Sequence, residues 1–324
     1  MADRIKQSLA LACGIALFTG AHTAVAQNYP ARPVRIILPF TSGGGTDILA
    51  RLLAQRLTEA LGQAVLVDNR PGAGGNLGAD LVAKAAPDGL TLLFSTTSTA
   101  INATLYSKLP FDIRKDLVAI TQVARSPVVV VTHPSVPARN VRELVELSKK
   151  IGGGLNFGSN GSGTVSHLAG TMLAQYSGIR LTHVPYKGAS IAVTSLLGGE
   201  VEVEFQASTS VLPYIRTGKL RALAVATKRR IAALPDTPTL DSIYPGLEID
   251  QWYVVFAPAG TPSSVVNRLH AELVKALQHN DVKTWMQREN SEPVGSSPAE
   301  ASALLNAEIE KYAKIVKASG AKAE

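Results

Sequence analysis

A single cysteine, Cys13, is present among the 324 residues of the chain. One thiol cannot form an intramolecular disulfide or build a cysteine-based zinc site, so a disulfide scaffold and a zinc finger are excluded. Aromatic residues are scarce at 5% and charged residues make up only 18%, but 46% of the residues are hydrophobic. Such a composition can bury a sizeable core, which excludes a disordered or fibrous chain. The length predicts about two domains.

Charge of one sign is not concentrated anywhere in the sequence. Lys and Arg together number 32 against 25 Asp and Glu, which gives a formal net charge of +7. The basic residues form only short pairs such as Lys149–Lys150 and Arg229–Arg230, whereas a nucleic-acid-binding protein gathers them into a patch or tail. We therefore expect no nucleic acid partner, and the modest positive excess favours small anionic ligands.

Recognisable catalytic motifs are also missing. The sequence contains neither the G-x-S-x-G motif of serine hydrolases nor the H-E-x-x-H motif of zinc proteases. Its acidic residues form no evident catalytic pair. We predict a binding protein that is not an enzyme and uses no metal and no cofactor. An enzyme acting through Asp47 or His167, such as a hydrolase or isomerase, is the distant alternative.

The first 26 residues have the three parts of a secretory signal peptide. Arg4 and Lys6 precede an apolar run over residues 9–18, and Ala24-Val25-Ala26 forms an A-x-A cleavage site. The apolar run is too short to cross a bilayer, so we predict cleavage near Ala26 and export of the remainder to the periplasm. A lipoprotein cut before Cys13 is a less favoured alternative, because that cut would leave almost no apolar region.

Strand-like and helix-like segments alternate along the rest of the chain. Short apolar, often β-branched runs predict strands at residues 34–38, 64–67, 91–95, 128–131, 155–157, 183–186, 201–205, 220–226 and 252–257. Helical spacing and capping residues predict helices at 48–61, 79–86, 140–150, 164–176 and 189–197, and two more with Thr261 and Ser297 as N-cap residues. This alternation is typical of βαβ units, so we predict an α/β fold with mainly parallel strands.

The pattern occurs twice, which predicts two lobes with a cleft between them. Right-handed crossovers would place helices on both faces of the sheet in each lobe. Chain crossings near Val128 and Ala226 would make the first lobe discontinuous, with residues 27–127 plus 227–324, and leave residues 128–226 as the second lobe. Three acidic residues alternate along a predicted strand and are expected to form one exposed face: Glu200, Glu202 and Glu204.

A glycine-rich turn separates the first predicted strand from the first predicted helix. Three consecutive glycines have no Cβ to block a positive φ, so their backbone N–H groups can converge, and the helix N-terminus adds about half a positive charge. Hydroxyl groups in the turn can donate to a carboxylate. The candidate binding residues are Phe40, Thr41, Ser42, Gly43, Gly44, Thr46 and Asp47. The alternative is a plain tight turn capped by Thr46, and Asp47 either serves an amine or orders the turn.

A second turn repeats this order of strand, Gly/Ser segment and helix in the other half of the chain. Its candidate residues are Ser159, Gly161, Ser162, Gly163 and Thr164. Ligands of open α/β sheets bind beyond the carboxyl ends of the strands, so we expect the two turns to face each other across the cleft. Neither turn has the lysine of a phosphate-binding loop or reads G-x-G-x-x-G, which disfavours a nucleotide ligand.

Further polar candidates lie at or beyond the ends of other predicted strands. His167 could point a ring N–H at the ligand, although a capping or packing histidine is commoner. Lys187 could neutralise part of an anion or remain solvated. The other candidates are Ser95, Thr96, Thr97, Gln206, Ala207 and Ser208.

Taken together, these segments resemble the receptors of tripartite tricarboxylate transporters, also called the Bug (Bordetella uptake gene) family. The resemblance covers essentially the whole chain after the signal peptide, in order. It is carried by residues 29–35 (YPARPVR), 39–47 (PFTSGGGTD), 67–76 (VDNRPGAGGN), 156–159, 161–164, 167–168, 184–188 (VPYKG), 197–199, 218–224 and 257–262 (APAGTP).

The resemblance implies a periplasmic solute-binding protein with a two-lobed Venus-flytrap fold. It implies capture of a small carboxylate and delivery to a membrane permease, and we expect a monomer. Main-chain groups and ordered waters at residues 40–46 would hold the carboxylate, while residues 159–164 and 205–208 would set selectivity. Many family members have Asp where Gln206 stands, so Gln206 disfavours an amino acid and favours a plain carboxylate. A ligand sensor that signals to a membrane kinase without transport is the alternative.

Overall fold

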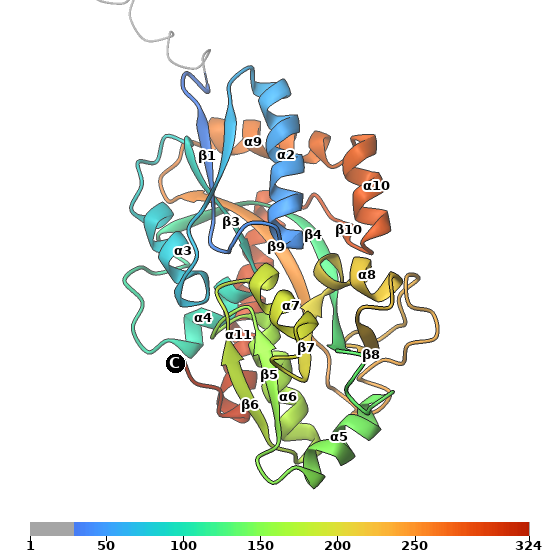
Figure 1. The fold of residues 1–324 in the computed structure, drawn as a ribbon. Coiled ribbons are helices and arrows are strands. Elements are labelled where there is room, and N and C mark those ends of the chain that lie inside the picture. The colour runs from blue at the N-terminus through green and yellow to red at the C-terminus, as the bar shows by residue number, and fades with distance from the viewer. Residues whose placement is uncertain (1–28, 324) are drawn as a thin grey trace, which may run out of the picture.

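The computed structural model describes residues 29–323 and has an α/β fold in which one curled sheet runs through two lobes (Figure 1). The predicted signal peptide and its cleavage site near Ala26 lie outside the described residues. The strands are β1 (Val34–Leu38), β2 (Val65–Asn69), β3 (Thr91–Thr96), β4 (Leu117–Thr132), β5 (Leu155–Ser159), β6 (Leu181–Pro185), β7 (Val203–Ala207), β8 (Arg221–Val225), β9 (Asp250–Pro258) and β10 (Glu292–Pro293). The α-helices are α2 (Gly45–Leu61), α3 (Asn76–Ala83), α4 (Ser98–Leu105), α5 (Val141–Lys150), α6 (Val165–Ser177), α7 (Ala189–Leu197), α8 (Ser208–Arg216), α9 (Ser263–Ala276), α10 (Asn280–Arg288) and α11 (Pro298–Ser319).

The long strand β4 joins two mainly parallel groups of strands. The order in the sheet is β2-β1-β3-β9-β4-β7-β5-β6, and β8 and β10 also pair with β4. β1 is parallel to β2 and β3, and β5 is parallel to β6 and β7. Residues 117–127 of β4 pair with β9, while residues 128–132 pair with β7. We call the part built on β1, β2, β3 and β9 the first lobe and the part built on β5 to β8 the second lobe.

Helices cover both faces of the sheet in each lobe, as predicted. In the first lobe, α2 and α9 bury Leu53 and Leu273 against one face, and α4 and α11 bury Ile101 and Leu305 against the other. In the second lobe, α6 covers one face and α7 and α8 cover the opposite face. No helix among residues 29–323 is long and apolar enough to cross a membrane.

Local sequence signals explain where several helices begin and end. α2 ends at Gly62, whose φ of 66° is left-handed, a conformation that glycine supplies at helix C-termini. Asn140 and Ser297 cap α5 and α11 as predicted, because their side chains accept hydrogen bonds from the backbone N–H groups of Glu143 and Glu300.

Other boundaries differ from the prediction. The N-cap of α9 is Pro262, and the hydroxyl of Thr261 instead donates to the Pro258 carbonyl oxygen at 2.7 Å, closing the turn that follows β9. α3 begins at Asn76, before the predicted residue 79. The short helices α4, α8 and α10 were not predicted.

The predicted exposed acidic face is also wrong. Glu204 has an exposed fraction of 0%, because β7 begins only at Val203 and lies between β4 and β5 with helices on both faces. Glu200 and Glu202 precede the strand, where no strand alternation applies; Glu200 is exposed and Glu202 is half-buried.

Candidate functional site

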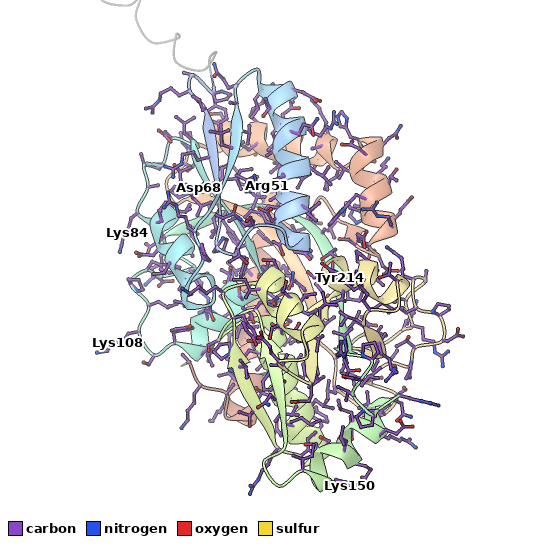
Figure 2. All side chains as sticks on the ribbon, in the orientation of Figure 1. Arg51, Asp68, Lys84, Lys108, Lys150 and Tyr214 are labelled. Atoms are coloured by element: carbon purple, nitrogen blue, oxygen red, sulfur yellow. The ribbon has the colours of Figure 1, made fainter. Side chains whose placement is uncertain are left out.

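The first glycine-rich turn connects β1 to α2 and is held in shape by Asp47. The Asp47 carboxylate accepts hydrogen bonds of 3.0 Å from the backbone N–H of Gly43, from Arg51 Nε and from Asn69 Nδ2. Arg51 lies on the side of α2 that faces β2, where it also donates to Asn69 Oδ1 (Figure 2). Burial disfavours the charged carboxylate, but these bonds outweigh that effect and lower the pKa of Asp47. Asp47 therefore orders the turn.

This arrangement leaves the N-terminus of α2 open. Its N-cap residue is Gly44, which has no side chain that could cap the helix, and Thr46 lies inside the first helical turn. The first N–H groups of a helix have no partner within the helix. Because Gly44 and Thr46 both line a cavity, these donors and the positive end of the helix form a site suited to an anion.

The second turn connects β5 to α6, and its hydroxyl groups bond mainly within the second lobe. Thr164 caps α6, and its Oγ1 donates to the Gly161 carbonyl oxygen at 2.7 Å. Ser159 Oγ accepts from the Gly161 N–H at 3.1 Å and lies 2.6 Å from His183 Nε2. These bonds fix the shape of the turn.

Two stacked histidines support this turn from behind. The rings of His167 and His183 stack with centroids 4.1 Å apart, and Phe157 stacks on His183 at 4.9 Å. His167 Nδ1 accepts a hydrogen bond from the Gly163 N–H at 3.2 Å. Burial lowers the pKa of His183 to about 4, because the charged ring is poorly solvated there. The histidines therefore pack and shape the turn.

The first turn lies against the second lobe. Thr41 Oγ1 and Ser190 Oγ, the latter from α7, share a hydrogen bond of 2.8 Å. A Cβ added to Gly44 would lie 3.4 Å from the Ala189 Cβ. The N-cap of α7, Gly188, also makes no side-chain capping bond. The described conformation is thus closed, with the N-termini of α2 and α7 brought close together.

Two neighbouring cavities lie at this boundary between the lobes. The first is lined by the predicted residues Phe40, Thr41, Gly44, Thr46, Asp47, Thr96 and Thr164, together with Asn160, Ala189 and Gln251. Its lining offers hydroxyl, amide and backbone groups and contains no lysine or arginine. The second cavity shares Phe40 and Asn160 with the first and includes the predicted Gly161, Ser162 and Lys187.

Other predicted residues line neither cavity and are bonded elsewhere. Ser95 Oγ bonds to Thr99 Oγ1, Thr97 Oγ1 accepts from the Trp252 N–H, and Ser208 Oγ donates to the Glu289 carbonyl oxygen. Gln206 is fully buried behind Asn160. The predicted residues outside the cavity linings are Ser42, Gly43, Ser95, Thr97, Ser159, Gly163, His167, Gln206, Ala207 and Ser208.

The closed two-lobed fold and the polar cleft define a solute-binding protein of the periplasmic type. A family model described as "Tripartite tricarboxylate transporter family receptor" matches residues 49–321. The chain therefore belongs to this family, as its sequence segments predicted. The family and the fold are those of receptors and not of enzymes.

Solved structures of similar proteins agree with this assignment. The periplasmic binding protein BugD is 33% identical, with a TM-score of 0.88 over 91% of this chain and 100% of that one. A protein of R. palustris with adipate is 32% identical, with a TM-score of 0.87 over 91% and 100%. MatC from Rhodopseudomonas palustris with bound malate is 31% identical, with a TM-score of 0.86 over 89% and 100%.

Proposed function

We propose that this protein is an extracytoplasmic receptor that captures a small carboxylate between its lobes and delivers it to a membrane permease. The ligand carboxylate binds at the open N-terminus of α2, beside Thr41 and Thr46. Residues of the second lobe, above all Asn160, complete the site and select among carboxylates. Adipate and malate, which similar proteins hold, are the first ligands to test.

The uncapped N-terminus of α2 is the observation that carries this proposal. A buried carboxylate is costly unless it receives hydrogen bonds. The first cavity supplies such donors from backbone N–H groups and threonine hydroxyls, without a lysine or arginine. Asp47 does not oppose an anion strongly, because its carboxylate is already engaged by Arg51, Gly43 and Asn69.

Ligand binding and lobe closure are coupled in this proposal. Closure brings the positive ends of α2 and α7 together, and an anion between them offsets their mutual repulsion. A ligand that contacts both lobes only in the closed state shifts the population toward closure. We place the hinge near Val128 and Ala226, with lobes of residues 27–127 plus 227–324 and 128–226. The hydrogen bond of 2.7 Å from the Ala226 N–H to the Val128 carbonyl oxygen supports this choice.

The receptor acts, in this proposal, as an exported monomer whose closed form is recognised by the permease. The family description supports a transporter partner. Deletion of the gene should abolish cellular uptake of the bound acid. Normal uptake combined with a lost transcriptional response to that acid would instead indicate a sensor.

Binding is tested by isothermal titration with malate and adipate and with their uncharged diamides as matched controls. The protein is first unfolded and refolded to remove any ligand that co-purifies. We expect an acid to bind and its diamide not to bind, and a ligand at about 100 times its dissociation constant should stabilise the protein by about 2.7 kcal/mol. Equal binding of acids and diamides would contradict the anion site. If the unfolded protein releases no ligand and a wider panel of acids gives no binding, the receptor function is wrong.

A further inference from the structure

A buried carboxyl group lies behind the ligand cleft, in the core of the second lobe. Glu204 and Gln206 are both fully buried on β7. On the neighbouring strand β4, Val131 lies opposite Glu204 and Val129 lies opposite Gln206. Both valines belong to the apolar cluster beneath α7 and α8. The neighbouring strand β5 makes room for the carboxyl group, because a Cβ on Gly158 would lie 2.5 Å from Glu204 Oε1.

A directed chain of hydrogen bonds runs from this carboxyl group to the cleft. Gln206 Nε2 donates to Glu204 Oε2 at 2.9 Å and to Asn160 Oδ1 at 2.8 Å. The backbone of Asn160 is fixed by its N–H, which donates to Ser166 Oγ at 2.9 Å. Asn160 itself lines both cavities, so it is the point at which this chain of hydrogen bonds reaches the cleft.

The direction of donation decides which end of the Asn160 amide is free. A primary amide has one oxygen acceptor and one nitrogen with two donors. Glu204 Oε2 is an acceptor, and both donors of Gln206 are used by Glu204 and Asn160. Asn160 Oδ1 is therefore occupied, while its Nδ2 has no hydrogen-bond partner among residues 29–323 and is not buried. The group left for a ligand is a donor.

We propose that Glu204 and Gln206 are positioning residues that hold Asn160 with its NH2 group toward the cleft, where it donates to the carboxylate of the ligand. This inference rests on the proposed carboxylate site. In this proposal, the buried carboxyl group of Glu204 determines whether the cleft favours an acceptor ligand, such as a carboxylate, or a donor ligand, such as an ammonium group. Burial raises the pKa of Glu204 to about 8. With its proton on Oε1, which has no partner among the described residues, Oε2 remains an acceptor.

Exchanging the two side chains tests this assignment. The double substitution Glu204→Gln with Gln206→Glu keeps the two shapes and the total charge but places the carboxyl group at position 206, beside Asn160. When its unprotonated oxygen faces Asn160, as that of Glu204 faces Gln206, Asn160 turns its NH2 group toward β7 and presents its carbonyl oxygen to the cleft. The same exchange made in a background with Asn160→Ala is the matched control, because the relay can then no longer act through Asn160.

We expect the exchanged variant to bind malate or adipate about 10- to 100-fold more weakly, since a hydrogen bond to a charged group is lost. In a background with Asn160→Ala, the exchange should have little further effect, because the relay acts through Asn160. The exchanged variant should also show a smaller preference for succinate over 3-aminopropanoate, in which an ammonium group replaces one carboxylate.

Three outcomes would overturn the inference. Equal affinities of the wild-type and exchanged proteins, with both folded by circular dichroism, would refute the relay while leaving the carboxylate receptor intact. An equally large loss when the exchange is made in the Asn160→Ala background would mean that the pair acts on general packing. Absence of carboxylate binding by the wild-type protein would remove both the site and the relay.

Discussion

Replacing Glu204 with glutamine should stabilise the protein by an amount that grows with pH. Burial raises the pKa of Glu204 from its ordinary 4.5 to about 8, and the bond from Gln206 offsets little of that effect. The folded protein therefore keeps a proton that the unfolded chain releases near pH 4.5. The wild-type protein therefore has its full stability below about pH 4.5 and loses stability as the pH rises toward 8.

The size of this effect follows from the two pKa values. A carboxyl group whose pKa is raised from 4.5 to about 8 destabilises the fold by about 5 kcal/mol once the pH exceeds both values, and by about 3 kcal/mol at pH 7. Glutamine has nearly the same shape, keeps an acceptor for Gln206 and does not titrate. The variant should therefore match the wild type near pH 5 and exceed it by several kcal/mol near pH 8.

Urea unfolding followed by circular dichroism measures this difference from about pH 5 to about pH 8.5. Glu292→Gln, at an exposed position on β10, is the control for removing one acidic side chain. A constant difference between the Glu204→Gln variant and the wild type over this range would refute the reasoning. It would mean that Glu204 is solvated or paired in the folded protein.

Two further substitutions test the closed cleft and the stacked histidines. Gly44→Val should weaken carboxylate binding by at least about tenfold in isothermal titration, because its side chain would press on Ala189 only in the closed state; unchanged affinity would contradict closure at this contact. Burial holds the pKa of His183 at about 4, while the ring in the unfolded chain gains a proton near pH 6.5, so the wild-type protein loses stability as the pH falls below 6.5. His183→Phe does not titrate and should therefore lose less stability over this range. Identical acid unfolding curves for variant and wild type would contradict that role.

Much of the fold could be predicted because its signals are local. The apolar run of β1, the glycines that follow it and the helical spacing of α2 all lie within about one βα unit of sequence. The caps at Asn140 and Ser297 depend only on a residue three positions further along. The full length of β4 was not predicted, because the strand is extended by its pairing with strands of both lobes and not by its local composition.

The candidate site was harder to predict because its parts come from distant segments. Gln251 lines the cavity near the start of β9 and has no local signal that links it to Thr41 or Thr96. Asn160 lies within the predicted second turn, but only the bond from Gln206 shows why its amide matters. Glu204 follows an alternation that predicts exposure, and the sheet neighbours that bury it are remote in sequence.

Closure of the lobes around a carboxylate is the central claim, and a distance between the lobes tests it most directly. Spin labels are attached at Lys84→Cys on the first lobe and Lys150→Cys on the second, both at exposed positions (Figure 2). Protein lacking residues 1–26 has no other cysteine. Pulsed electron resonance should show a broad distribution of label distances that malate or adipate shifts and narrows, while the diamide leaves it unchanged. An acid that binds without changing the distribution would contradict the account.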